Sequence, residues 1–244
     1  QAIKRDWQNL GAGVLGLAAK ESFARHTAQI KKLLDLTVHV GVSSNLILDP
    51  APDSYFLMDV AVSRLPVLVE DLGQLRGMSA GIVARRQIAD GEKTQLSKLI
   101  ARSQITHEGV QDSLDLAFKY NGTLKPLLGP SQDAFGTSAQ DFLALVEQRI
   151  VDGAQIDAAL AASEVFAAGT RAIEAGFKLY DATAPALLEL LRSRVADLNL
   201  KKYTTLCGVL VCAMLALGLA YGFVRAIVRS LRQADAVAAA IEAG

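Results

Sequence analysis

The chain has 244 residues, and its 25 lysines and arginines balance its 25 aspartates and glutamates, so bulk charge gives no support to nucleic-acid binding. Aromatic residues make up only 6% of the sequence, and the abundance of alanine favours closely packed long helices over a β-sandwich or an enzyme-like α/β core. Both cysteines, Cys207 and Cys212, lie in one uncharged stretch, so the remainder has no thiol for a disulfide framework or a metal–thiolate site.

Helical periodicity covers almost the whole chain. Apolar residues recur three and four positions apart, and no segment sustains the two-residue alternation of a strand. Asp49-Pro50, Pro52-Asp53, Gly129-Pro130 and Asp152-Gly153 interrupt the pattern, and Pro185 is expected to kink it or mark a joint. The expected helices are residues 3–46, 55–88, 92–121 (extended to 128 in one reading), 133–151, and about 155 onward.

Short connections between these helices favour antiparallel neighbours. The predicted fold is therefore all-α, an elongated up-down helical bundle that continues into a transmembrane helix. Helices of about 30–45 residues would be about 45–65 Å long. A single four-helix bundle and a stacked pair of bundles both fit this pattern.

Residues 203–224 form a stretch without a charged side chain, long enough for one helical crossing of a bilayer at about 20 residues per span. Lys201 and Lys202 precede it and arginines follow it, so the distribution of positive charge leaves the orientation open. Three regions follow from this division: a helical domain at 1–202, the membrane span at 203–224, and the opening of a second helical element, the linker, at 225–244. This is the layout of a transmembrane receptor.

The linker at 225–244 is amphipathic again. Its apolar positions, at three- to four-residue spacing, include Val224, Ile227, Val228 and Leu231 and continue at Ala234, Val237 and Ile241. Such a helix suits a parallel bundle with a dimer mate, and a helix lying on the membrane surface is the alternative. The chain starts at Gln1 already in helical pattern and stops at Gly244 just after an amphipathic turn, so both ends look cut. If residues 1–202 lie outside the membrane, we expect a membrane-targeting helix before them.

Three stretches resemble the sensor half of bacterial methyl-accepting chemotaxis proteins with all-helical ligand-binding regions. The residues that carry the resemblance are SNLILDPAPDSYFLMD (44–59), LGQLRGMSAG (72–81) and FAAGTRAIEAGFKLYDATAPALLELLRSRV (166–195). VRSLRQADAVAAAIEAG (228–244) resembles the first helix of a HAMP linker.

This resemblance implies a homodimeric chemoreceptor in the bacterial inner membrane, with 1–202 in the periplasm and 225–244 in the cytoplasm. It implies no enzymatic activity in this chain, no cofactor, and output to a cytoplasmic kinase and adaptor through a domain beyond residue 244. The same architecture occurs on membrane histidine kinases, which remain an alternative. A third hypothesis is recognition of a ligand-loaded periplasmic protein by an exposed, membrane-distal surface around residues 49–55.

Two arginines on the helix at 55–88 are the first candidate ligand-binding residues. Arg64 lies on the apolar face, and Arg76 lies near Gly73, Gly77 and Gly81, which recur every fourth residue. A buried guanidinium needs a partner, so these arginines either pair with carboxylates of neighbouring helices or hold an organic acid or small inorganic anion. The glycines indicate either close helix approach or room for a ligand.

Arg171, Thr170 and Tyr55 are the remaining candidates. Arg171 belongs to a run of charges at helical spacing, which indicates either a solvated, salt-bridged face or one side of a ligand site to which Thr170 adds a hydrogen bond. Tyr55 follows the double-proline turn and either lines a pocket or simply starts its helix. The three histidines lack metal-ligand spacing, and no catalytic or metal-binding residue is predicted.

Overall fold

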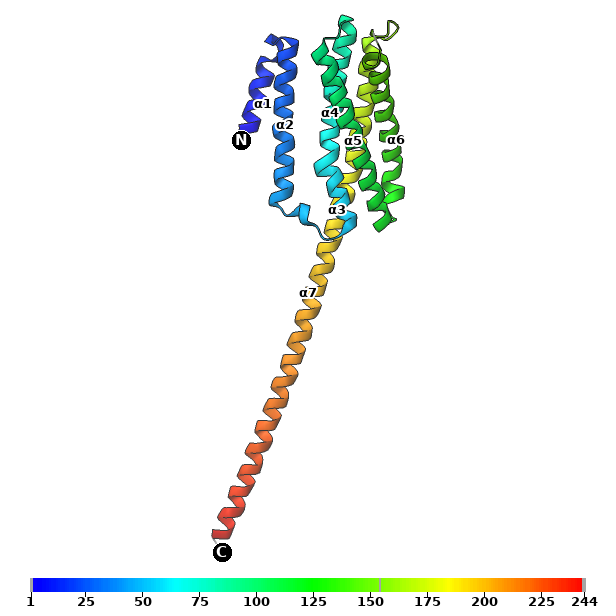
Figure 1. Cartoon of the computed structure of the whole chain (residues 1–244). Helices are drawn as coiled ribbons and strands as arrows, with labels where there is room; N and C mark the ends of the chain where they lie inside the picture. The colour runs from blue at the N-terminus through cyan, green and yellow to red at the C-terminus, as the bar shows by residue number, and fades with distance from the viewer. Residues whose placement is uncertain (1, 154, 243–244) are drawn as a thin grey trace. The chain divides into compact units, whose positions relative to one another are not determined.

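The computed structural model describes residues 2–153 and 155–242, with side chains described only as far as Gln233. Within these residues helices are the only regular structure, which confirms the all-α prediction (Figure 1). The chain divides into two compact units, Gln1–Leu190 and Leu191–Gly244, and the longest helix contributes to both. The elements are α1 (Ala2–Gly13), η1 (Val14–Gly16), α2 (Ala19–Ser43), η2 (Leu46–Leu48), α3 (Pro52–Met58), η3 (Asp59–Arg64), α4 (Leu65–Arg85), α5 (Asp90–Tyr120), α6 (Leu124–Val146), η4 (Glu147–Val151) and α7 (Ala162–Glu242).

An antiparallel four-helix bundle forms the core of the first unit, built from α3–η3–α4, α5, α6 and the beginning of α7. Asp71 of α4 bonds Arg102 of α5, and nearer the start of this helical segment Arg64 lies against Gly109. Residue numbers thus rise on one helix as they fall on its neighbour. Short connections enforce this alternation, as the sequence predicts.

The same reversal relates α7 to α4. Arg76 bonds Thr170, and a Cβ added at Gly176 would lie 2.7 Å from Val69 Cγ2. Extending this register along both helices puts Tyr55 level with the end of the part of α7 that belongs to the first unit. The turn around residues 49–55 therefore lies at the same end of the bundle as the last residues that α7 contributes to the first unit.

Apolar side chains from all four helices fill the bundle. Phe135 and Phe142 of α6 are the largest fully buried ones, and leucines of α3, α4 and α5 complete the layers between them. The large residues that are almost fully buried include Leu57, Leu65, Leu68, Leu72, Leu75, Ile82, Leu96, Leu114, Leu128, Phe135, Phe142, Ile150 and, on α7, Leu179. Their three- and four-residue spacing along each helix is the pattern from which the sequence predicts a bundle.

The structure has two helices where one was expected at 3–46. The first, α1, ends at Gly13, the chain turns through η1, and α2 begins at Ala19, so that α1 and α2 form an antiparallel hairpin. Gln29 Nε2 donates to the carbonyl of Ile3 at 2.8 Å, and Lys32 Nζ contacts Asp6 at 2.8 Å. Glycines at 11, 13 and 16 weaken the helix where the chain reverses, and periodicity alone cannot detect that break.

Other helix boundaries also differ from those expected from the sequence. The break expected at Gly129-Pro130 falls earlier, at Asn121–Thr123, and α6 carries Pro130 inside its second turn. In the last helix the start shifts from about 155 to Ala162, and the helix continues through Pro185 without ending. The helices expected at 55–88 and 92–121 agree with α3–η3–α4 and α5 to within a few residues.

A π-helical turn, η3, joins α3 to α4 just before Pro66. Proline lacks the N–H that would bond the carbonyl four residues earlier, and its ring collides with that carbonyl. Widening the turn by one residue removes this conflict without interrupting the helix. Sequence periodicity reads straight through 55–88 because one extra residue barely disturbs the apolar pattern.

The second unit is the C-terminal part of α7. Within it, residues 203–224 are uncharged and their side chains are exposed in the isolated chain. Among the described residues one helix is long and apolar enough to cross a membrane, with a mean hydropathy of 2.2 over its best window. The expected linker positions Val224, Ile227, Val228 and Leu231 are exposed on this helix, whereas Ala234, Val237 and Ile241 lie beyond the described side chains.

Candidate functional site

Arg64 lies in the π turn and is already paired with a carboxylate. Its Nε contacts Asp59 Oδ2, and Ser113 of α5 donates to the same oxygen at 2.9 Å. The wider turn brings residues five apart onto one face, which makes this pairing within one helix possible. Its guanidinium crosses Gly109, where an added Cβ would lie 2.1 Å from Arg64 Nη1. These contacts agree with the structural alternative for Arg64.

A second arginine–carboxylate pair joins α4 to α5. Arg102 Nε donates to Asp71 Oδ2 at 2.6 Å, and Arg102 Nη2 donates to Asp71 Oδ1, which makes a bidentate pair. Asp71 is 1% exposed, and its burial raises the pKa of its carboxyl group although Arg102 opposes the shift. Sequence reasoning missed this pair because the facing helix, and hence the partner, is set by tertiary packing.

Arg76 contacts α7 and is bonded to no carboxylate among the described residues. Its Nη1 donates to Thr170 Oγ1 at 2.9 Å, and its guanidinium carbon lies 4.6 Å from the centre of the Phe166 ring. Gly169 makes this crossing possible, because an added Cβ would lie 2.8 Å from both Arg76 Cβ and Cγ. The structure thus brings together two of the predicted site residues, Arg76 and Thr170.

The remaining donors of Arg76, Nε and Nη2, form a fork with no hydrogen-bond partner among the described residues. Of the two, Nε is buried. Nε and Nη2 are the two donors with which Arg102 holds the Asp71 carboxylate in the same bundle. Leaving a buried donor unpaired costs about 1–3 kcal/mol, which an anion would recover by accepting from this fork.

Arg171 and Tyr55 do not join this cluster. Arg171 is exposed, and its side chain makes no hydrogen bond or ion pair with the described residues. Tyr55 packs edge-on against Phe56, at 5.3 Å between ring centres, and Phe56 stacks on Tyr120. Tyr55 precedes Arg76 by 21 helical residues, or about 30 Å at 1.5 Å per residue. Tyr55 therefore belongs to an aromatic cluster at the far end of the helical segment.

The glycines at 73, 77 and 81 do not form one contact ridge. A Cβ at Gly77 would lie 3.1 Å from Phe23 Cε2 of α2, which agrees with close helix approach. At Gly73 no atom lies within 4 Å, and at Gly81 the neighbour is Arg85 of the same helix. Close approach therefore explains one of these glycines, and the tighter crossings lie elsewhere, at Gly169 and Gly176.

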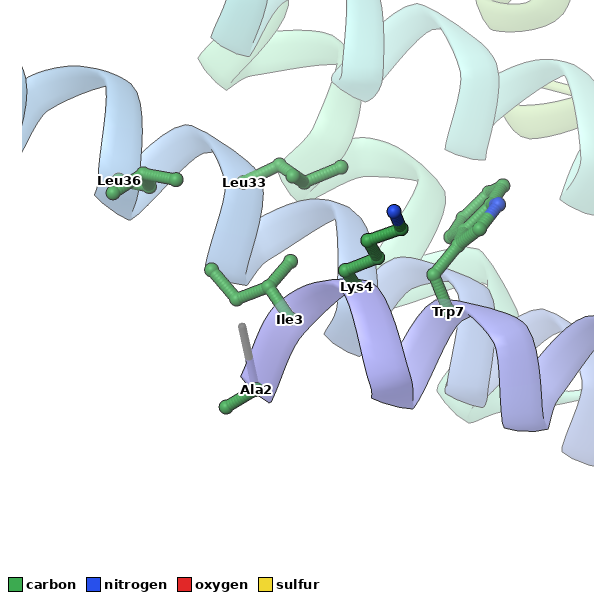
Figure 2. Close-up of a pocket in the computed structure, with 6 residues that line it drawn as sticks. All are labelled: Ala2, Ile3, Lys4, Trp7, Leu33 and Leu36. Carbon is green, nitrogen blue, oxygen red and sulfur yellow. The ribbon is translucent and has the colours of Figure 1, made fainter.

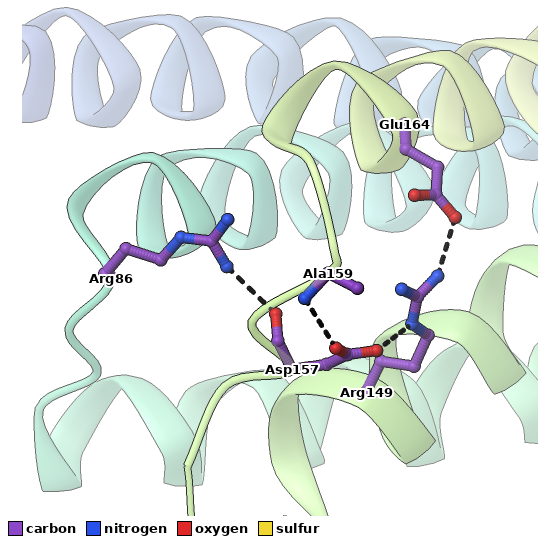
Figure 3. Close-up of polar contacts among 5 residues, drawn as sticks. All are labelled: Arg86, Arg149, Asp157, Ala159 and Glu164. Atoms are coloured by element: carbon purple, nitrogen blue, oxygen red, sulfur yellow. Dashed lines mark hydrogen bonds and ion pairs between the residues drawn. The ribbon is translucent and has the colours of Figure 1, made fainter.

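A polar cluster fixes the connection between α6 and α7 (Figure 3). Arg149 Nε donates to Asp157 Oδ2 at 2.7 Å, Arg149 Nη1 donates to Glu164 Oε1 at 2.6 Å, and Arg86 Nη1 donates to the Asp157 carbonyl at 2.9 Å. The Ala159 N–H and Arg149 lower the pKa of Asp157. These bonds hold the start of α7 against the end of α4. They also give Arg86 a structural partner.

Two hollows lie away from Arg76. One, of about 610 Å³, is lined by Ala2, Ile3, Lys4, Trp7, Leu33 and Leu36 and opens on the α1–α2 hairpin (Figure 2). Its lining is almost wholly apolar, with Lys4 at the edge. The other, of about 490 Å³, lies between α5 and the α6–η4 segment, and its lining includes His107, Glu108 and Glu147.

Among the described residues, no group of three or more histidine, cysteine, aspartate or glutamate side chains is arranged to hold a metal ion. The chain matches no family model, no curated protein and no solved structure.

Proposed function

We propose that this chain is the sensor region of a transmembrane chemoreceptor and that it binds a small anion between α4 and α7. The observation that carries the proposal is the contact of Arg76 with Thr170. It joins a guanidinium whose charge has no bonded carboxylate to a helix that is continuous with the apolar segment. Residues 1–202 form the external domain, 203–224 the span and 225–244 the opening of the linker.

The ligand is an organic acid or a small inorganic anion. Nε and Nη2 of Arg76 can donate to two oxygens of a planar anion, in the geometry in which Arg102 binds Asp71. Phe166 covers one face of the guanidinium, and Thr170 adds a hydroxyl that can turn toward an incoming oxygen. Arg64 has a structural role because Asp59 neutralises it.

Signalling follows from the position of the site. Because Nε of Arg76 is buried, an anion reaches it only in a packing in which α7 has shifted against α4. The ligand favours that packing in proportion to its differential affinity for the two states. The displacement passes along α7 to residues 203–224 and then to a cytoplasmic kinase pathway through a domain beyond residue 244.

Exposed apolar residues on α7 support a membrane and a dimer as partners. Those in 203–224 suit lipid, whereas Val195 and Leu198 stand three apart on one face before the apolar segment. An apolar pair on an otherwise polar helix suits a second copy of α7. We therefore propose a homodimer in the bacterial inner membrane, with the bundle in the periplasm.

Calorimetric titration of the full chain in lipid nanodiscs, against small carboxylic acids and nitrate, tests the anion site. We expect micromolar binding by at least one anion, and a loss of affinity of about 30-fold or more in Arg76→Ala, because that change removes the charged donor. Thr170→Val weakens binding less, because a hydroxyl contributes a neutral hydrogen bond.

Two variants serve as controls. Arg171→Ala removes an exposed arginine next to Thr170 in the sequence, and Arg64→Ala removes one that is already paired with Asp59; both retain the wild-type affinity to within about threefold. Unchanged binding in Arg76→Ala, with helical content preserved, would overturn the site. A complete absence of heat with every anion would overturn direct anion sensing.

A further inference from the structure

A hydrogen-bonded chain of four side chains links α5 to α6. His107, Gln111 and Asp115 follow one another at four-residue intervals on α5, and Gln132 reaches them from α6. Gln132 Nε2 donates to Asp115 Oδ1 at 3.2 Å and to Gln111 Oε1 at 2.6 Å, while Gln111 Nε2 lies 3.3 Å from His107 Nε2. We call these four residues the amide chain.

The direction of every bond in the amide chain is set from its carboxylate end. An ionised Asp115 only accepts, so Gln132 must turn its NH2 group toward it. The same NH2 group bonds the Gln111 oxygen, which leaves the Gln111 NH2 group facing the histidine ring. His107 Nε2 is therefore an acceptor, and its ring is neutral with the proton on Nδ1.

Close packing holds the ring in this arrangement. His107 is 5% exposed, and its ring lies 5.8 Å from the ring of Phe135 on α6. Gly136 of α6 faces the same bonds, since a Cβ there would lie 3.1 Å from Gln111 Nε2 and 3.7 Å from His107 Nε2. The α6 backbone therefore lies directly against the histidine–amide contact.

Protonation of His107 conflicts with the bonds of the amide chain. A proton on Nε2 would face the Gln111 NH2 group, donor against donor. Turning the Gln111 amide moves the same conflict to Gln132, and turning the Gln132 amide sets its oxygen against the Asp115 carboxylate. The cost falls on His107 and Gln132, which are 5% and 7% exposed, because Gln111 is half-buried and Asp115 is exposed to water. The neutral ring and the closed α5–α6 contact therefore support each other.

Two glutamates line the hollow beside His107, where they can pair with an imidazolium. The hollow of about 490 Å³ beside the ring is lined by Glu108 of α5 and Glu147 of η4, while α6 contributes Gln140, Leu143 and Ala144. On the face of α5 toward α4 and η3, Asp71 and Arg64 are already bonded to Arg102 and Asp59. Glu147 accepts from Gln104 Nε2 at 3.4 Å, and neither Glu108 nor Glu147 is paired with a cation among the described residues.

We propose that His107 is a proton-operated switch of the α5–α6 contact. Proton binding at Nε2 breaks the amide chain and moves the imidazolium toward Glu108 and Glu147, which opens α6 against α5. The switch is independent of the anion site on α4 and α7, since it uses no residue of that site.

The direction of the pH response follows from burial. Burial lowers the pKa of His107 below its usual 6.5, although Glu108 opposes the shift. As pH falls through that usual value, the open or unfolded chain binds the proton and the closed bundle does not, so the closed bundle loses stability. Each unit by which the folded pKa is depressed lowers Tm by about 3–5 °C for a chain of this size.

Nitrogen-15 NMR of the full chain in detergent, labelled at histidine, tests the switch directly. At pH 7.5 we expect the His107 resonances of an Nδ1–H tautomer, and between pH 7 and 5 a protonation that coincides with a fall in Tm. His107→Gln removes most of that fall, whereas His39→Gln, at an exposed position, leaves it unchanged. An Nε2–H tautomer at pH 7.5 would overturn the assignment of the amide chain.

Gln111→Glu provides a second test, because it adds a negative charge beside His107 in a side chain of similar shape. Its carboxylate accepts from both Gln132 and a protonated His107, so we expect the His107 pKa to rise by at least about one unit and the acid-induced fall in Tm to disappear. Spin labels at Ile105→Cys and Thr137→Cys, with Cys207 and Cys212 changed to serine, measure the α5–α6 distance. An unchanged distance between pH 7.5 and 5, with His107 protonated, would refute the opening.

Discussion

Replacing Arg102 with alanine is expected to destabilise the bundle by about 3 kcal/mol at pH 7, because it leaves the Asp71 carboxylate buried and unpaired between α4 and α5. The two ends of this pair differ in exposure: Asp71 is almost fully enclosed, whereas the Arg102 side chain is 56% exposed. The loss of one partner is therefore not equivalent to the loss of the other.

The reverse substitution, Asp71→Ala, is expected to cost less than Arg102→Ala, because Arg102 stays hydrated when its partner is removed. A double variant, Arg102→Ala with Asp71→Asn, recovers part of the loss by removing the buried charge. Hydrogen exchange of α4 and α5 amides in the full chain in detergent measures the local stability in each variant. Equal costs for the two single substitutions would contradict this assignment.

The penalty in Arg102→Ala depends on pH in a defined direction. Burial raises the pKa of Asp71 in the folded chain, and removal of Arg102 takes away the bonds that oppose this shift. A carboxyl group with a raised folded pKa destabilises the fold above its unfolded pKa and ceases to do so as pH falls through the folded value. The Arg102→Ala variant therefore approaches wild-type stability in acid, after correction for the shared effect of His107.

Gly169→Ala is expected to destabilise the contact of α7 with α4 and α6 by up to about 2 kcal/mol. The added methyl group would lie 2.8 Å from Arg76 and 2.9 Å from Phe142 Cζ, so neighbouring side chains must move. Overpacking of this kind costs about 1–3 kcal/mol, against a gain of about 1 kcal/mol from replacing a helical glycine. Urea unfolding followed by circular dichroism measures the difference.

Gly73→Ala is the matched control, because it lies on α4 with no atom within 4 Å of the added Cβ. It should stabilise the chain by about 1 kcal/mol through helix propensity alone. Gly176→Ala collides with Val69 and Phe135 but not with Arg76. It should lower stability without changing anion affinity, whereas Gly169→Ala lowers both. A stabilising effect of Gly169→Ala would contradict the tight crossing.

Periodicity predicts the helices of the bundle better than their ends. The helices at 55–88 and 92–121 have long apolar stripes and clear turn residues, and their observed limits agree. The α1–α2 turn and the true start of α6 depend on weak local signals, namely scattered glycines and the Asn121–Thr123 connection. Pro130 illustrates the error: α6 begins six residues before this proline and continues through it, so Pro130 does not mark the boundary.

Residue chemistry predicts which side chains need partners, but not which partners they find. An arginine on an apolar helix face, such as Arg64 or Arg76, is expected to need one. Residue chemistry cannot say that Arg64 finds Asp59 through a π turn while Arg76 finds a hydroxyl and an aromatic ring. Arg102, Asp71 and the amide chain carry no distinctive motif, since each depends on which residues face each other across two helices.

The amino-acid sequence alone determines the helical class of this protein, the apolar faces that drive its helices together, and one stretch fit to cross a membrane. These properties follow from local spacing and composition, which each segment carries by itself. The tertiary structure alone decides the antiparallel register that sets Arg76 against Thr170 and His107 against Gln111. Register results from the packing of whole helix faces against one another. Glycines at the crossings, such as Gly169 and Gly176, allow a close approach that a larger residue at the same position would prevent.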